Sequence, residues 1–206
     1  MHNTNDSLGQ IILLNGTPRS GKSSIAAEIQ ATFPGVWINL GVDVYMKAIP
    51  KQFQPGIGLR PGGERPDMEP MIQNLYYALY QSIAAHSRAG INVVADVGHH
   101  DFYATIHGIL PMCARVLQGL PAVFVGVHCP IDEIMRRRIA TWNAGYEADE
   151  SIPAPVLRWQ TAVHSHGIYD VEVDTSLITP QKCAQQIAQY MACNTPTALA
   201  RLSQME

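Results

Sequence analysis

The chain has 206 residues, of which 47% are hydrophobic and 15% are charged, and its formal net charge is −3. This composition excludes a largely disordered chain, and without a positive excess a sequence-independent nucleic-acid binder is not expected. No apolar run approaches the roughly 18 residues that span a bilayer, and the polar N-terminus lacks a signal-peptide pattern. The four cysteines lie far apart with no CxxC pair, as in a reduced cytoplasmic protein. We therefore expect one cytoplasmic domain over residues 1–206, with no membrane or nucleic-acid partner.

Short apolar runs alternate with longer amphipathic segments along the chain. The predicted strands are residues 10–14, 36–42, 91–97, 122–129 and 171–174. The segments between and after them predict helices over residues 22–33, 66–88, 101–118, 131–142, 154–164 and 180–193. The strands are nearly continuous in apolar residues, which is typical of parallel strands buried on both faces. The alternation predicts an α/β fold: a three-layer, doubly wound parallel sheet of five strands with helices on both faces.

Two stretches interrupt this alternation. Residues 51–66 hold three prolines and four glycines, which predicts an irregular loop. Residues 143–155 are acidic and polar, which predicts an exposed connection. Lid segments at 51–66 and 143–157 that cover a site are one interpretation, and plain surface insertions are the other.

The segment after the first predicted strand matches the phosphate-loop pattern GxxxxGK[ST] in full. It consists of Gly16, Thr17, Pro18, Arg19, Ser20, Gly21, Lys22 and Ser23, and Ser24 follows it. The glycines let backbone amides turn toward phosphate oxygens, Lys22 brings a charge to the β- and γ-phosphates, and the Ser23 hydroxyl is a Mg²⁺ ligand. The pattern predicts a nucleoside triphosphate site, against the alternative of a glycine-rich turn with an incidental lysine.

Two aspartates follow apolar strands at the edge of the sheet where this loop lies. Without an NKxD-like guanine-reading motif, a small-molecule or nucleotide kinase fits better than a regulatory GTPase. A kinase needs a metal-side carboxylate and a group that receives the proton of the acceptor hydroxyl. Asp43 ends the second predicted strand and Asp96 ends the third, and ligands of open α/β sheets bind outside the carboxyl ends of strands. We therefore expect both to flank the phosphate loop, and a helix-cap or turn role is the alternative for each.

Five blocks of the chain together resemble the chloramphenicol phosphotransferase family. They cover residues 12–24, 41–43, 96–97, 125–129 and 169–175, in the family's order and at similar spacing. The Gly-Val-Asp block and the Tyr-Asp-Val-Glu-Val-Asp-Thr block make the match more specific than the phosphate loop alone. The resemblance implies a P-loop kinase with a nucleoside-monophosphate-kinase-like fold. It also implies that ATP and Mg²⁺ are used to phosphorylate the primary hydroxyl of the antibiotic, which inactivates it.

The resemblance also implies roles for single residues. Asp43 falls on the aspartate that the family uses as catalytic base, and Asp96 falls on the aspartate at the end of the third strand, where it serves Mg²⁺ or the acceptor. Related kinases place adenine near the loop at residues 175–179, so Thr175 is a nucleotide-binding candidate. The chain departs from the family pattern at Ala95 and within the phosphate loop, so the acceptor stays more open than the reaction type.

A run of three arginines, Arg136, Arg137 and Arg138, follows the fourth predicted strand. In small kinases this region is a lid whose arginines clamp the transferring phosphoryl group. Consecutive helical residues point about 100° apart, so at most one or two of the three reach a shared site. Arg137 is the catalytic candidate, with surface ion pairs to the acidic residues one turn earlier as the alternative, and Arg158 is a second lid candidate.

The acceptor candidates lie beside the two aspartates. They are Tyr45 and Met46, directly after Asp43, and His99, shortly after Asp96. The region from residue 45 to residue 80 is rich in aromatic and methionine side chains, which suits a flat apolar acceptor with tyrosine hydroxyls to orient it. Core packing is the alternative for the helical stripe within 66–88. Adjacent histidines at 99 and 100 have poor geometry for one zinc ion, so an acceptor contact is the better interpretation.

These patterns together predict an ATP-dependent O-phosphotransferase with Mg²⁺ as cofactor and a small-molecule alcohol as acceptor. A kinase for another hydroxylated metabolite, such as a nucleoside or a sugar, is the first alternative. A nucleotide-binding module with little turnover is the second. The sequence leaves the acceptor and a homo-oligomeric state open.

Overall fold

A five-stranded parallel sheet forms the centre of the computed structural model, which describes residues 7–143 and 145–205. The strands are β1 (Ile11–Asn15), β2 (Trp37–Asn39), β3 (Asn92–Val97), β4 (Ala122–His128) and β5 (Val171–Asp174). Their order is β2-β3-β1-β4-β5, and every neighbouring pair is parallel. The predicted doubly wound α/β fold is confirmed. The start of the predicted domain at residue 1 and residue 144 of the predicted second lid lie outside the described residues.

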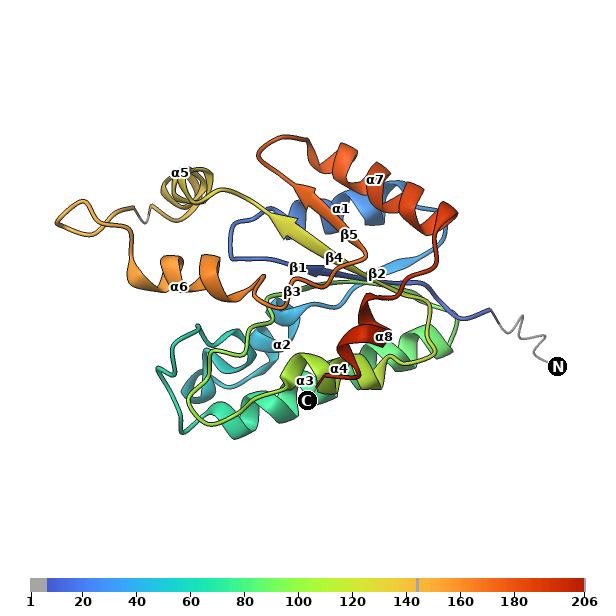
Figure 1. The fold of residues 1–206 in the computed structure, drawn as a ribbon, viewed down its shortest axis with the longest axis horizontal. Coiled ribbons are helices and arrows are strands. Elements are labelled where there is room, and N and C mark those ends of the chain that lie inside the picture. The colour runs from blue at the N-terminus through green and yellow to red at the C-terminus, as the bar shows by residue number, and fades with distance from the viewer. Residues whose placement is uncertain (1–6, 144, 206) are drawn as a thin grey trace.

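Helices cover both faces of the sheet and complete three layers (Figure 1). One face carries α1 (Lys22–Thr32) and α7 (Pro180–Cys193), and the other carries α3 (Glu69–Arg88), α4 (Ile109–Val116) and α8 (Ala198–Leu202). Side chains along a strand point alternately to the two faces. Ile12 and Leu14 of β1 therefore pack with α1 and α7, whereas Ile11 and Leu13 pack with α3, α4 and α8.

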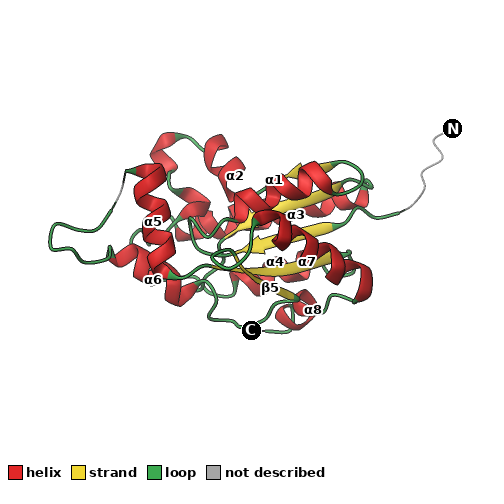
Figure 2. Ribbon diagram, turned by 90° about the horizontal axis from the view of Figure 1, so that it is seen from above, coloured by secondary structure: helices red, strands yellow, loops and turns green. Residues whose placement is uncertain are grey.

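The remaining elements gather toward the carboxyl ends of the strands (Figures 1 and 2). They are α2 (Val42–Ala48), the short 3₁₀ helices η1 (Lys51–Phe53) and η2 (Gly56–Gly58), α5 (Ile131–Trp142) and α6 (Ala154–Ala162). Helices α5 and α6 project past the tips of the strands in Figure 1. Ligands of open α/β sheets bind at this edge, so these elements are placed to shape a site.

The second strand is shorter than predicted, and this changes the position of Asp43. β2 ends at Asn39 instead of residue 42, and Asp43 lies in the first turn of α2, not at a strand end. The connection depends on Gly41, because a Cβ atom there would lie 1.8 Å from Asp96 Oδ1 and 2.7 Å from the Asp96 carbonyl oxygen. At Gly41 the chain passes close to β3, where no side chain would fit, and α2 begins at the next residue. The run of apolar residues does not reveal this long-range contact.

The helix predicted at residues 101–118 is also shorter, because α4 covers only Ile109–Val116. Glu69, at the start of α3, holds the loop before it. Its carboxylate accepts hydrogen bonds from the N–H groups of Ala104 at 2.7 Å and Thr105 at 2.6 Å. Burial is the largest single influence and opposes the charged form of Glu69, but a hydrogen bond from the Thr105 hydroxyl at 2.5 Å, together with the backbone donors, outweighs it and lowers the pKa of Glu69. Backbone donors bound to this carboxylate are not available to a helix.

The two predicted lid segments differ in burial. Within residues 51–66, Ile57 and Leu59 are only 1% and 2% exposed, and both pack in the core beside α3. Most of the described residues from 145 to 155 are exposed or partly exposed. Residues 51–66 are therefore partly built into the core, whereas the described residues from 145 to 155 lie at the surface, a difference that the two sequence patterns do not reveal.

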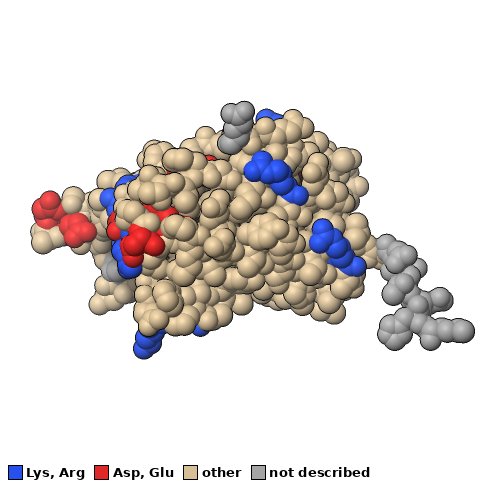
Figure 3. All heavy atoms as spheres, turned by 90° about the horizontal axis from the view of Figure 1, so that it is seen from below, with Lys and Arg blue, Asp and Glu red and all other residues tan. Residues whose placement is uncertain are grey.

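Within the two described ranges, no helix combines the length and the apolar character needed to cross a membrane. Figure 3 shows one face of the molecule, on which acidic side chains gather mainly toward the end that carries α5 and α6, whereas Lys and Arg side chains are scattered over the face. No broad basic area is present among the described residues on that face.

Candidate active site

A cleft of about 1030 Å³ opens at the carboxyl end of the sheet. The phosphate loop, α2, η2, α3, the end of β3, α5 and α6 all contribute to its lining. Of the predicted site residues, the following line it: Gly16, Thr17, Pro18, Arg19, Gly21, Lys22, Ser23, Ser24, Asp43, Met46, Asp96, Arg137 and Thr175. The structure thus brings together residues from both halves of the chain around one space.

The phosphate loop turns sharply between β1 and α1. Arg19 and Gly21 both have left-handed backbone conformations, with φ of 68° and 99°. Glycine carries no strain in this conformation, and Gly21 precedes α1 without a side-chain cap. The hydroxyl oxygens of Thr17 and Ser20 are buried without a hydrogen-bond partner among the described residues. Such unpartnered buried atoms are rare in native structures, and both belong to the tight turn of this loop.

Lys22 folds back over the loop. Its Nζ donates hydrogen bonds to the carbonyl oxygens of Gly16 at 2.7 Å and Thr17 at 2.8 Å. The pKa of Lys22 is lowered to about 8, chiefly because burial disfavours the ammonium, while the charges of Asp96 and Asp43 oppose this effect. The ammonium is therefore weakly solvated, and phosphate oxygens are stronger partners for it than neutral carbonyls.

Ser23 and Asp96 form an oxygen pair beside Lys22. Ser23 Oγ donates a hydrogen bond to Asp96 Oδ2 at 3.0 Å, which joins the start of α1 to β3. Mg²⁺ prefers oxygen ligands and commonly takes one or two protein oxygens together with phosphates and waters. This donor set fits such an ion. Among the described residues no group of three or more His, Cys, Asp or Glu side chains could hold a metal, so Mg²⁺ here would rely on phosphates and water.

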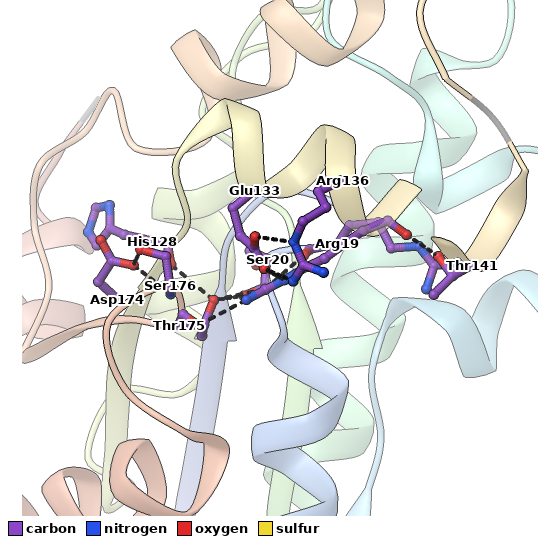
Figure 4. Close-up of polar contacts among 10 residues, drawn as sticks. Arg19, Ser20, His128, Glu133, Arg136, Thr141, Asp174, Thr175 and Ser176 are labelled. Carbon is purple, nitrogen blue, oxygen red and sulfur yellow. Dashed lines mark hydrogen bonds and ion pairs between the residues drawn. The ribbon is translucent and has the colours of Figure 1, made fainter. Parts of the chain in front are cut away.

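Arg137 joins the phosphate loop, α5 and the loop after β5, and Figure 4 labels its partners Arg19, Glu133 and Thr175. Its guanidinium donates to Thr175 Oγ1 at 3.0 Å and to the carbonyl oxygens of Thr175 at 2.9 Å and Arg19 at 3.2 Å. Its Nε donates to Glu133 Oε1 at 2.7 Å, so the ion pair considered from the sequence is also present. Thr175 in turn donates from Oγ1 to the Ser20 carbonyl oxygen at 2.6 Å. Arg137 therefore positions the phosphate loop and the loop after β5.

Of the arginines that line the cleft, Arg19 and Arg138 are the two whose guanidinium groups form no hydrogen bond or ion pair with described residues. Both lie against the ring of Trp142, with Cζ-to-centroid distances of 3.7 Å for Arg19 and 5.5 Å for Arg138. The Nε atom of each is buried without a hydrogen-bond partner among the described residues. The sequence patterns do not identify Trp142 as a site residue. The available indication is that a large aromatic side chain ends a helix rich in charged residues. The stack holds two cations beside the phosphate loop.

Asp43 lies exposed in the first turn of α2 and lines the cleft. Burial lowers the pKa of Arg19, and the charge of Asp43 opposes that shift, so the two groups are close enough to interact. Asp43 acts in the same direction on Lys22. A carboxylate thus lines the same cleft as Lys22 and Arg19 and interacts with both cations.

One part of the cleft lining, called the apolar end below, consists of uncharged side chains. Its lining includes Met46, Ile57, Tyr76, Val97 and Trp159, which come from α2, η2, α3, β3 and α6. None of these side chains is charged. This end suits the apolar body of a small molecule.

Two predicted acceptor residues lie elsewhere. Tyr45 is partly buried and packs against the core, and it is not part of the cleft lining. His99 is 1% exposed and forms a hydrogen bond of 2.7 Å between its Nε2 and the hydroxyl of Tyr80. Burial lowers the pKa of His99 to about 3, so its ring is neutral at physiological pH. His99 lies behind the wall of the cleft and supports Tyr76, which it contacts with ring centroids 4.6 Å apart.

Comparison with known proteins places these features in a family. The family model described as chloramphenicol phosphotransferase-like protein matches residues 9–192. A Mycobacterium tuberculosis protein that carries a provisional O-phosphotransferase name is 27% identical over 215 residues, which cover 94% of this chain and 88% of the relative.

Solved structures of kinases share the fold at low sequence identity. A sugar kinase from Janibacter has a TM-score of 0.61 and 11% identity, covering 96% of this chain and 99% of its own. An APS kinase from Mycobacterium tuberculosis, in complex with AMPPNP and APS, has a TM-score of 0.59 and 13% identity, covering 90% and 98%. A shikimate kinase from Acinetobacter baumannii, in complex with shikimate, has a TM-score of 0.58 and 13% identity, covering 91% and 94%.

Proposed function

Since this chain belongs to the chloramphenicol phosphotransferase-like family and is a kinase-type enzyme, we propose that it transfers the γ-phosphoryl group of ATP to a hydroxyl of a small uncharged alcohol. The observation that carries the proposal is that Lys22 and Asp43 line one cleft, and that this cleft continues into an apolar end. One space therefore offers a phosphate site, a carboxylate and room for an organic acceptor.

The donor side binds and positions ATP. The backbone amides of residues 16–22 hold the β-phosphate, and Lys22 exchanges its carbonyl partners for β- and γ-phosphate oxygens. Arg19 and Arg138 stabilise charge on the transferring group from their stack on Trp142. Arg137 keeps Thr175 and the phosphate loop in register, and Thr175 and Pro180 border the space for adenine.

Ser23 and Asp96 would hold Mg²⁺. When bound, the ion supplies positive charge to the phosphates. Asp43 takes the proton of the acceptor hydroxyl and orients its oxygen for in-line attack on the γ-phosphorus. In a loose transition state most of the catalysis comes from this positioning and from the cations.

The acceptor side favours an uncharged molecule. Arg60 borders the apolar end, but its Nε lies 3.3 Å from Glu64 Oε2, and Arg158 also pairs with Glu64. Arg60 is therefore ion-paired, and the other side chains named for this end carry no charge. Chloramphenicol, an uncharged aromatic alcohol, has the chemistry that such a pocket accepts. Inactivation of this antibiotic is the activity that the family description suggests.

We also propose that residues 143–157 act as the lid on the donor side. Tyr146, Glu147, Pro153 and Pro155 line the cleft, yet their segment contributes little to the core. A cover of this kind is free to move when ATP enters and ADP leaves.

The test is ADP formation by the purified protein with ATP and Mg²⁺, with and without chloramphenicol, nucleosides and sugars. We expect ADP to form faster with the uncharged aromatic alcohol, with a matching phosphate ester in the ³¹P spectrum. ADP formation that is unchanged by every acceptor, in a protein that binds ATP, would instead indicate a nucleotide-binding module. Faster turnover of a sugar or a nucleoside would support the kinase activity and show that the proposed acceptor is wrong.

A further inference from the structure

The apolar end of the cleft contains a buried hydroxyl with no protein partner among the described residues, that of Tyr76. Tyr76 lies on α3, is 2% exposed and lines the cleft. No described residue forms a hydrogen bond with its hydroxyl, although the hydroxyl of Tyr80 on the same helix has a partner. The hydroxyl is also not among the polar atoms that are sealed from all accessible space, so it reaches the cleft. Buried hydroxyls usually have a partner, which makes this one a candidate for a ligand contact.

Tyr80, one helical turn later, shows what a structural tyrosine looks like in the same helix. It is fully buried, and its hydroxyl forms a 2.7 Å hydrogen bond with His99 Nε2. It does not line the cleft. Both tyrosines lie on α3 and both are buried. They differ in that the Tyr80 hydroxyl has a protein partner and the Tyr76 hydroxyl has none among the described residues.

The Tyr76 ring is held at a fixed place relative to the phosphate loop. His99 packs against it at 4.6 Å with an interplanar angle of 33°. The His99 backbone N–H donates to Asn15 Oδ1 at 2.7 Å, and Asn15 directly precedes Gly16 of the phosphate loop. Asn15 is itself anchored by a 2.8 Å hydrogen bond from Nδ2 to the Tyr169 hydroxyl. The position of the Tyr76 hydroxyl is therefore tied to the place where the phosphoryl group is transferred.

We propose that Tyr76 is a specificity-determining residue whose hydroxyl hydrogen-bonds a polar, uncharged group of the acceptor other than the hydroxyl that is phosphorylated. This inference rests on the proposed function and names a contact of the same site. A neutral phenol in an apolar wall can donate and accept, so it pairs with a hydroxyl, an amide or a nitro group. A site built this way discriminates against analogues that lack the group, because the phenol then stays unpaired.

The phenol stays neutral at working pH. Burial raises the pKa of Tyr76 well above its usual range, and the nearby Cys113 acts in the same direction. His99, which packs against the ring, is neutral, and burial raises the pKa of the neighbouring Tyr80 and Tyr103 hydroxyls well above the usual range. The contact is therefore expected to be insensitive to pH between about 6 and 9.

The test compares Tyr76→Phe with Tyr80→Phe, using chloramphenicol as the probe. Binding to the nucleotide-free protein is measured by calorimetry, and phosphorylation is measured with saturating ATP. For Tyr76→Phe we expect chloramphenicol affinity and kcat/KM to fall about 10- to 100-fold, with the KM for ATP and the melting temperature unchanged. For Tyr80→Phe we expect a lower melting temperature, because His99 loses its partner, and unchanged affinity of the folded protein.

Each outcome separates the contact from the reaction. Binding that weakens only in Tyr76→Phe, in a wild-type protein that does not phosphorylate chloramphenicol, supports the contact and overturns the proposed reaction with this acceptor. Equal binding by wild type and Tyr76→Phe, in an active enzyme, overturns the contact and leaves the reaction standing. A lower melting temperature in Tyr76→Phe without weaker binding makes Tyr76 structural. No binding of chloramphenicol to the wild type overturns the contact for aromatic alcohols of this kind.

Discussion

The donor wall of the cleft is held by hydrogen bonds and charges, whereas the acceptor wall is held by apolar packing. On the donor wall, Arg137 and Thr175 link the phosphate loop to α5 and to the end of β5. On the acceptor wall, Ile57 and Leu59 pack with Ile72 of α3 in one buried cluster. The difference teaches that the donor wall is built around a short motif that long-range hydrogen bonds hold in place, whereas the acceptor wall has no such motif and is formed only by segments that meet in the folded chain.

The largest expected effect comes from removing the main charge of the donor wall. Lys22→Ala leaves the β- and γ-phosphates without their ammonium, so we expect turnover to fall roughly 10³-fold and ATP affinity to fall sharply. We expect an unchanged melting temperature. The substitution removes two hydrogen bonds to carbonyl oxygens, but it also removes an ammonium whose burial is unfavourable, and the two effects oppose each other. Steady-state kinetics and calorimetry with ATP measure the change.

The matched control is Lys47→Ala, which removes an exposed lysine from α2 outside the cleft lining. It should behave as wild type. Wild-type turnover in a folded Lys22→Ala protein would remove the phosphate loop from the reaction and break the contrast between the two walls.

The next effect is on stability and belongs to the acceptor wall. Ile57→Ala removes a buried side chain from the cluster beside α3, so we expect the free energy of unfolding to fall by about 2–5 kcal/mol. Urea denaturation measures it, with Val44→Ala on the exposed side of α2 as the control, expected to change within about 0.5 kcal/mol. An Ile57→Ala protein as stable as wild type would show that residues 51–66 are a surface insertion after all.

The smallest effect is a pH dependence on the donor wall. Lys22 has a pKa near 8 in the free protein, and binding to phosphates requires its charged form. Above about pH 8 the free protein must take up a proton to bind ATP, so affinity should fall about tenfold per pH unit. Calorimetry at pH 8.5 in two buffers of different ionisation enthalpy reports the proton uptake. Affinity that is flat from pH 7 to pH 9.5 would mean that Lys22 is fully charged in the free protein.

The same contrast explains which parts of the fold and of the site can be predicted from the sequence. Lys22, Ser23 and the glycines around them are readable because a loop of eight residues carries their chemistry. Four of the five strands lie within about two residues of their predicted bounds, since buried parallel strands are continuous apolar runs. The family resemblance is confirmed by the match over residues 9–192.

The acceptor wall is less readable because its geometry depends on long-range contacts. Asp43 is brought to the cleft by a helix that starts after Gly41 passes Asp96, not by a strand end. The sequence indicates an acceptor role for His99 from its place after a strand end, and for the tyrosines between residues 45 and 80 as a group, without separating Tyr76 from Tyr80. In the structure Tyr76 lines the cleft, and His99 supports it from behind.

The measurement that tests the central claim most directly is the pair of ATP affinity and acceptor phosphorylation rate on Asp43→Asn. The substitution keeps the shape of an exposed side chain at the start of α2 and removes its ability to take a proton. We predict wild-type ATP affinity and a turnover reduced by 10²- to 10⁴-fold, toward about 10²-fold if Asp43 mainly orients the hydroxyl. Asp132→Asn, an exposed change on α5 away from the cleft, should leave both quantities unchanged. Normal turnover in Asp43→Asn would contradict the account, and lost ATP binding would move Asp43 to the donor wall.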